Sequence, residues 1–308
     1  MTIEDLKQLQ NEILNNIKKC NLIGRTILFI IFVIITILCL LIIKNIFIAV
    51  PIYIITTVIY LIIMSTIKHK KNATNIKHFH NEFKKIFVQS ALSEVFDNLT
   101  YNHQDGISQD YMYEKGILTI GDIYTSNDYI SGTYKSIKFD QSDVSIQIEV
   151  EVEDEEGNKT TEYETIFYGR YMIFDFNKKF KSNMVITNSH SSALSRGKLF
   201  NSQPITLEDQ EFNKSFAVFA QNEHEAFYIL TPHFMNKIKN ISNKLRSGLI
   251  FFFDDNKLHI AINNYDDSFE PNLYEPIDEH KIKNAIKEDI LLITDFVNDL
   301  ALDNNLFK

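Results

Sequence analysis

The chain has few of the residues that cross-link or interrupt a fold. Its 308 residues include no Trp, two Cys, five Pro and nine Gly. Cys20 precedes the first long apolar run and Cys39 lies inside it, so the two cannot plausibly form a structural disulfide. The composition excludes a disulfide-stapled scaffold. It fits a reducing compartment, or a fold that needs no cross-links.

Motifs for catalysis or nucleotide binding are also missing. The sequence contains no G-x-S-x-G, H-E-x-x-H, G-x-x-x-x-G-K-[ST] or G-x-G-x-x-G. It has no internal repeat, no low-complexity tract and no Gly/Ser-rich linker. We therefore predict no catalytic residue, no cofactor-binding residue, no metal ligand and no cofactor. A protein that is not an enzyme is favoured.

Charge is absent from two adjacent apolar runs, residues 26–43 and 46–67, which only Lys44 and Asn45 separate. A membrane-spanning helix needs about 20 apolar residues. The runs predict a transmembrane hairpin, with the lipid bilayer as a partner. Because basic residues flank both outer ends, we expect a multi-pass protein of the inner (plasma) membrane with both termini cytoplasmic.

Charge is unequal along the chain. Residues 1–77 carry a net charge of +6 and residues 78–308 carry −15, which together give the net −9 of the whole chain. An acidic body is repelled by phosphates, so we expect no nucleic-acid partner.

Helical periodicity flanks the apolar hairpin. Apolar residues recur every three or four positions over 2–24 and every four positions over 76–99. We expect an amphipathic helix over 1–25, the hairpin over 26–67, a juxtamembrane helix over 68–99 and a cytoplasmic domain over 100–308. The two amphipathic helices either pair as an antiparallel stalk or each pack on the cytoplasmic domain.

The rest of the chain alternates between strand and helix patterns. Val and Ile alternate with polar residues over Asp143–Glu153, and a second run of strand formers follows at Thr160–Tyr168, which predicts a hairpin. Leu249–Phe253 and Lys257–Ile262 predict another. Helices are expected near 109–115, 223–230, 231–246 and 280–302. The fold class is therefore α+β, a cytoplasmic domain with an antiparallel sheet and packed helices behind the transmembrane hairpin.

Several segments resemble one bacterial family. They are Phe167-Tyr-Gly169, Phe174-Asp-Phe176-Asn177, Glu211-Phe-Asn-Lys-Ser-Phe216 and Glu225-Ala-Phe-Tyr-Ile-Leu-Thr-Pro232-His-Phe-Met235, with Phe269-Glu270-Pro271 later. Their order is similar to that of domain of unknown function 3137. The resemblance implies two N-terminal transmembrane helices and a cytoplasmic α+β domain, but no activity.

The signature residues of this resemblance also have a structural interpretation, as core, turn and helix-start positions. They are Gly169, Phe212, Phe216, Glu225, Ala226, Leu230, Thr231, Pro232 and Phe234.

The function expected first is a non-enzymatic, membrane-anchored protein-interaction or scaffold module. Its partner is an unidentified protein, with a second copy of the chain as an open alternative. Another hypothesis is a tethered hydrolase that uses His190, His224 or His233, which requires a pocket where two of them meet a carboxylate or Ser. A third is an accessory subunit of a transport complex. Arg170 and Arg196 are candidate anion anchors, although surface salt bridges are the simpler expectation.

Overall fold

The structure is a computed structural model that describes residues 1–38, 46–153, 157, 159–176, 179–188, 204–300 and 302. The chain divides into two compact units. The first comprises Met1–Phe87 and Pro271–Glu279, and the second comprises Val88–Glu270 and His280–Lys308.

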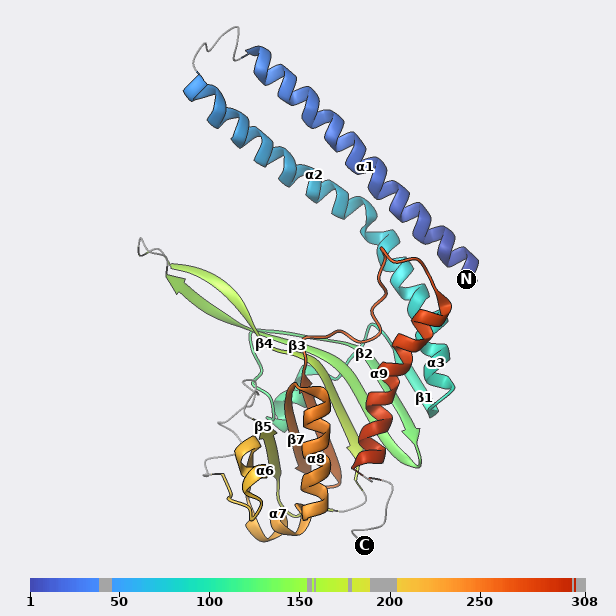
Figure 1. Ribbon diagram of the computed structural model, residues 1–308, viewed down its shortest axis with the longest axis vertical. Helices are drawn as coiled ribbons and strands as arrows, with labels where there is room; N and C mark the ends of the chain where they lie inside the picture. Colours follow the sequence, from blue (N-terminus) through green and yellow to red (C-terminus); the bar gives the residue numbers. More distant parts are fainter. Residues whose placement is uncertain are drawn as a thin grey trace. The chain divides into compact units, whose positions relative to one another are not determined.

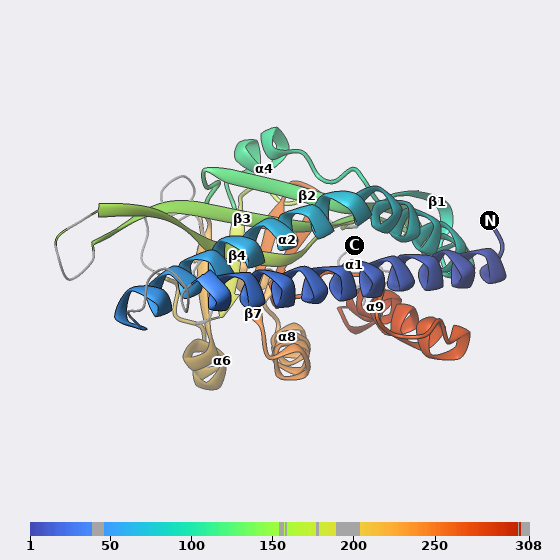
Figure 2. The same cartoon turned by 90° about the horizontal axis from the view of Figure 1, so that it is seen from above.

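Two long helices build the first unit. Helices α1 (Ile3–Leu38) and α2 (Ile46–Phe83) run side by side in opposite directions (Figures 1 and 2). The apolar stripes predicted for the flanking segments are buried, including Leu6 and Ile13 of α1 and Phe79 of α2. The amphipathic segments therefore belong to longer helices that pair with each other.

The expected transmembrane hairpin over 26–43 and 46–67 is corrected here. Crossing the hydrocarbon layer takes a helix of about 20 consecutive apolar residues. Within the described part of the chain, no helix is both long and apolar enough for this. The turn at Lys44 and Asn45 lies outside the described residues. The same finding corrects the predicted inner-membrane localisation.

The helix expected over 68–99 ends earlier than its spacing predicts. After α2 come one turn of π-helix (Lys84–Val88) and α3 (Gln89–Ser93), and strand β1 (Asp97–Asn102) then begins. Asn98 has a φ of 51°, and Thr100 pairs with Ser131 of the next strand. Leu99 continues the four-residue spacing, but strand pairing decides its conformation.

In its described residues, the second unit holds an eight-stranded sheet in the order β1-β2-β3-β4-β8-β7-β5-β6, with every pair antiparallel. The remaining strands are β2 (Ile123–Tyr134), β3 (Ile137–Glu153), β4 (Lys159–Asp175), β5 (Met184–Asn188), β6 (Phe216–Ala220), β7 (Gly248–Asp254) and β8 (Lys257–Asn263). The α+β class with an antiparallel sheet is confirmed.

Besides α3, five helices accompany the sheet in the described part of the second unit. They are α4 (Gln109–Lys115), α6 (Gln210–Ser215), α7 (Glu223–Ile229), α8 (Pro232–Leu245) and α9 (Glu279–Asp299). Short polar residues start four of them. The side chains of Ser108, Asp209, Asn222 and Thr231 each accept the backbone N–H three residues on.

Helices cover both faces of the sheet centre, with α4 on one face and α8 and α9 on the other (Figure 2). Phe296 of α9 lies 6.2 Å from Phe174 and 6.4 Å from Phe251, measured between ring centroids. On the other face, Met112 of α4 belongs to a buried cluster with Tyr171 and Phe252. Strands β7 and β8 are therefore buried on both faces and read as apolar runs without alternation.

Strands β3 and β4 continue beyond the sheet as a two-stranded arm (Figure 1). We call residues 148–153 and 159–164 the ribbon. They pair in continuous register from Ile148 with Glu164 to Glu153 with Lys159. The hairpin predicted from sequence is present here, and residues 154–156 and 158 of its turn lie outside the described residues.

Candidate functional site

The family-signature residues lie in the core, at helix starts and in one strand. Phe212, Phe216, Ala226, Leu230 and Phe234 are buried, and the rings of Phe212 and Phe216 stack at 4.7 Å. Thr231 is the N-cap of α8, and Pro232 is its first residue. Glu225 accepts hydrogen bonds from the N–H of Lys181 (2.9 Å) and the hydroxyl of Ser182 (2.5 Å), next to the start of β5.

Gly169 lies inside β4, where φ is 156°. A Cβ at this position would meet the carbonyl oxygen of Ile262 at 2.1 Å and Oδ1 of Asn264 at 2.5 Å. The glycine therefore permits close approach of the end of β8 and of Asn264 just after it, rather than a turn.

The histidines of the hydrolase hypothesis do not form a described site. His224 on α7 and His233 on α8 are both exposed, and His190 lies outside the described residues. One hollow of about 870 Å³ is lined by described residues of α6, β6 and α8, among others. No histidine is among its described lining residues.

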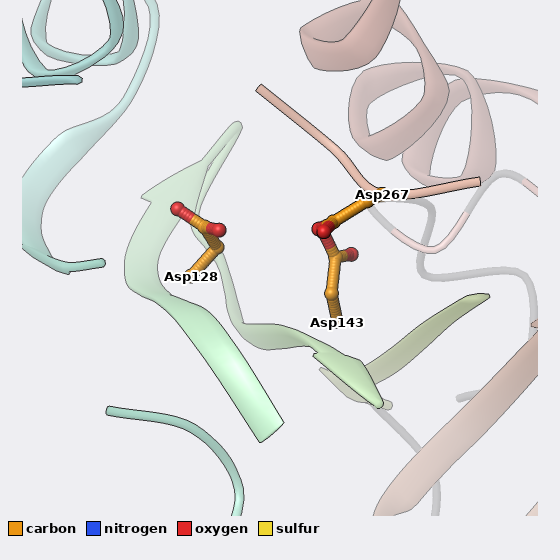
Figure 3. Close-up of side chains that lie close together, drawn as sticks. All are labelled: Asp128, Asp143 and Asp267. Atoms are coloured by element: carbon orange, nitrogen blue, oxygen red, sulfur yellow. The ribbon is translucent and has the colours of Figure 1, made fainter. Parts of the chain in front are cut away.

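Three carboxylates lie close together in an acidic cluster that we define as Asp128, Asp143 and Asp267 (Figure 3). One carboxylate oxygen from each lies within 4.8 Å of the other two. Asp128 comes from an irregularity in β2, Asp143 from β3 and Asp267 from the segment after β8. Asp128 and Asp143 are buried, with 0% and 2% of their surface exposed.

Each buried carboxylate of the cluster already has protein donors. Asp143 accepts from the N–H of Ser268 (2.6 Å) and from its hydroxyl (2.9 Å). Asp128, at a φ of 52°, accepts from the Tyr101 hydroxyl (2.6 Å) and the Asn127 amide (2.8 Å). These bonds link β1 to β2, and β3 to the segment after β8.

One guanidinium supplies positive charge beside the cluster. Arg170 of β4 is the cross-strand neighbour of Asp143 and is 2% exposed. It forms an ion pair with the Asp289 carboxylate of α9 and donates to the Asp289 carbonyl oxygen at 3.1 Å. The surface salt bridge expected for Arg170 is thus a buried one. Arg196 lies outside the described residues.

Burial dominates the electrostatics of this region. It raises the pKa of Asp143 well above its ordinary value, against the opposing effects of Arg170 and Ser268. Burial and the negative charge of Asp267 raise the pKa of Tyr168 to about 12. Burial and Asp128 likewise raise the pKa of Tyr101. The region disfavours additional negative charge.

Three carboxylates at this spacing have the ligand chemistry of a divalent cation site. Four of their six oxygens nevertheless accept protein hydrogen bonds, and only Oδ1 of the partly exposed Asp267 is a buried atom without a partner. We interpret the cluster as a structural junction of strands and assign no ion to it.

Sequence reasoning missed this cluster. In the sequence, Asp143 is only the first residue of the alternating run Asp143–Glu153. Arg170 follows the predicted strand Thr160–Tyr168 by two residues, so the pairing of Asp143 with Arg170 appears only once β4 is seen to run on to Asp175. Asp128 and Asp267 gave no local signal.

The ribbon is the most exposed part of the sheet and carries an excess of acid. Its glutamates are Glu149, Glu151, Glu153, Glu162 and Glu164, all exposed. Lys159 is its only described basic residue and pairs with Glu151 at 3.0 Å, with both side chains more than half exposed. The described residues of the ribbon therefore carry net negative charge at the surface.

Comparison with known proteins identifies a similar family, and that family's description names no activity. Residues 165–302 match the model of a family described as "Protein of unknown function (DUF3137)". This confirms the predicted resemblance for that part of the chain. No curated protein matches.

The crystal structure of the mycobacterial trehalose monomycolate transport factor A, TtfA, matches with a TM-score of 0.36 and 9% identity. The match covers 70% of this chain and 92% of that chain. A likeness this distant carries no argument about function.

Proposed function

We propose that this chain is a non-enzymatic protein-interaction module and that its ribbon is the surface that binds the partner protein. One observation carries the proposal: an exposed, acidic, two-stranded arm extends beyond the sheet (Figure 1). An isolated two-stranded hairpin is only marginally stable in water. A long arm of this kind gains stability when a second protein covers it.

The charge of the ribbon supports the same proposal. Glu149, Glu151 and Glu153 follow one another on one face of β3, opposite Tyr163, Thr161 and Lys159, and neighbouring like charges on one face repel. A basic partner surface would relieve this repulsion and would steer association at low ionic strength.

Site-specific photocrosslinking in cells tests the proposal. A photoreactive amino acid replaces Tyr163, in the ribbon and 53% exposed, or Tyr274, outside it and 69% exposed. We expect a discrete adduct with one protein at position 163 and none at position 274. Because the control is the more exposed residue, random collision would favour it.

A shortened chain that lacks the ribbon provides a second experiment. Replacing residues 149–163 by Asn-Gly leaves Ile148 facing Glu164 across a two-residue hairpin turn. We expect the sheet to stay folded and the protein captured at position 163 to stop copurifying. The proposal would be contradicted if the same protein copurified equally with the shortened chain, or if adducts formed equally at positions 163 and 274 of the full chain.

A further inference from the structure

The outer edge of β3 loses its neighbour where the ribbon begins. The N–H of Asp122 donates to the carbonyl oxygen of Gln147 (2.8 Å), and the Asp122 carboxylate accepts the N–H of Glu149 (2.7 Å). Beyond Glu149, the register of β2 has ended, and β3 has no described strand on this side.

The same bonds give the direction of the backbone groups. Because the N–H of Glu149 donates to Asp122, it points away from β4. In an antiparallel pair, N–H and C=O groups face the partner strand only at every second residue. The N–H and C=O of Glu151 therefore also point outward, and Val150 between them pairs with Glu162.

Side chains alternate in the same stretch. Glu149, Glu151 and Glu153 lie on one face of β3, and Ile148, Val150 and Val152 lie on the other. A strand added along this edge would place its own side chains beside these two rows. Opposite charges and pairs of β-branched residues are the favourable cross-strand neighbours.

We infer that the β3 edge of the ribbon, from Glu149 to Glu153, accepts a strand of the partner protein in which basic residues alternate with β-branched apolar ones. The inference rests on the proposed function and names the chemistry of its partner. A second copy of the ribbon does not fit, because it would set glutamate beside glutamate.

Labelled peptides binding to the purified full-length chain test the inference. The first probe is Thr-Lys-Val-Lys-Val-Lys-Thr, and the second has the same residues shuffled as Lys-Lys-Lys-Val-Val-Thr-Thr. Fluorescence anisotropy at low ionic strength should show about tenfold tighter binding of the alternating peptide, because only it matches both rows of side chains. Equal affinities would overturn the inference.

Matched charge variants locate the binding edge. Glu149, Glu151 and Glu153 are changed together to Gln, and the control changes the exposed Glu94, Glu208 and Glu288 to Gln. The first variant should bind the alternating peptide about tenfold more weakly, and the control should bind within about twofold of the unchanged chain. Equal losses would mean that the peptide responds only to net charge, which contradicts the inference.

Two measurements test the backbone pairing itself. Glu151→Pro removes the outward N–H while keeping the bonds between β3 and β4, and Glu151→Gln loses only the charge. The Pro variant should bind about fivefold more weakly than the Gln variant. In the unchanged chain, the alternating peptide should slow hydrogen exchange at the Glu151 amide, and an unchanged exchange rate would overturn the inference.

The two proposals fail separately. If position 163 captures a partner in cells and the two peptides bind equally, the ribbon is an interaction surface that does not add a strand. If the alternating peptide binds as expected and position 163 captures nothing, strand addition stands and the cellular interaction does not.

Discussion

At the scale of single residues, a few buried polar groups pair with one another inside the fold. Arg170 lies between Asp143 and Asp289, so one guanidinium compensates carboxylates from β3 and α9. Tyr171 and His259 form another buried pair, 3.0 Å apart between the hydroxyl oxygen and Nδ1. Removing one partner from such a pair costs more than the pair contributes, because the other stays buried.

Arg170→Met should lower the free energy of unfolding by about 3–5 kcal/mol, because it leaves the buried carboxylate of Asp143 and the partly exposed carboxylate of Asp289 without their cation. Lys159→Met is the matched control, since it breaks the exposed pair with Glu151 and should cost less than about 1 kcal/mol. Urea unfolding of both variants measures the difference. Similar losses would mean that Arg170 is not the main compensating charge.

His259 should make the fold sensitive to acid. Burial, with the charges of Lys115 and Lys257, lowers its pKa to about 3 from the ordinary 6.5. Below pH 6.5 the His259 imidazole therefore binds a proton in the unfolded chain but stays neutral in the folded chain. Stability falls by about 1.4 kcal/mol per pH unit until the pH approaches the folded pKa.

Replacing the buried ring tests this dependence. Between pH 7 and pH 4, His259→Phe should lose roughly 3 kcal/mol less stability than the unchanged chain, measured by urea unfolding at each pH. His224→Phe changes an exposed histidine and should leave the slope as it is. If both variants keep the original slope, the acid sensitivity arises elsewhere.

At the scale of elements, local chemistry starts the helices and pairing decides the strands. Thr231 accepts the N–H of Phe234 at 3.3 Å and begins α8, whose buried face includes Phe234 and Ile238. By contrast, β1 follows a helical spacing and is a strand because it pairs with β2.

Thr231→Ala should lower the free energy of unfolding by about 1 kcal/mol, because the first turn of α8 loses its side-chain acceptor. Thr231→Asp keeps an acceptor and should recover most of this loss. Thr206→Ala, at an exposed position before α6, is the control and should change stability by less than about 0.5 kcal/mol. Thermal unfolding distinguishes the three variants.

At the scale of the whole molecule, the sheet combines a centre covered on both faces with an arm that none of the described helices covers. Strands β7 and β8 are buried nearly throughout, and the ribbon is mostly exposed. Stability is therefore distributed unevenly, and the surface proposed for binding is the least protected part of the sheet.

Hydrogen exchange should reveal this gradient. Ribbon amides such as Val150 should exchange through local opening, and amides such as Phe251 and Ile260 should exchange only on global unfolding. The measurement is native-state exchange against low concentrations of denaturant. Matching opening free energies in both regions would show that the ribbon is stable without a partner.

The amino-acid sequence determined the features that depend on neighbouring residues. Alternation predicted the β3–β4 hairpin, and two strand-forming runs around a short polar turn predicted the β7–β8 hairpin. A capping threonine followed by proline predicted the start of α8. These signals act within a few residues. The transmembrane hairpin predicted from hydropathy was wrong, since no described helix is long and apolar enough to cross a membrane.

Only the tertiary structure decided the order of the strands, the conversion of 97–102 into an edge strand, and the meeting of Asp128, Asp143 and Asp267. These residues are far apart along the chain, and no local pattern distinguishes them from exposed carboxylates. Their proximity follows from which strands pair and where β4 and α9 place Arg170 and Asp289. Long-range packing sets those positions, and spacing along the sequence does not.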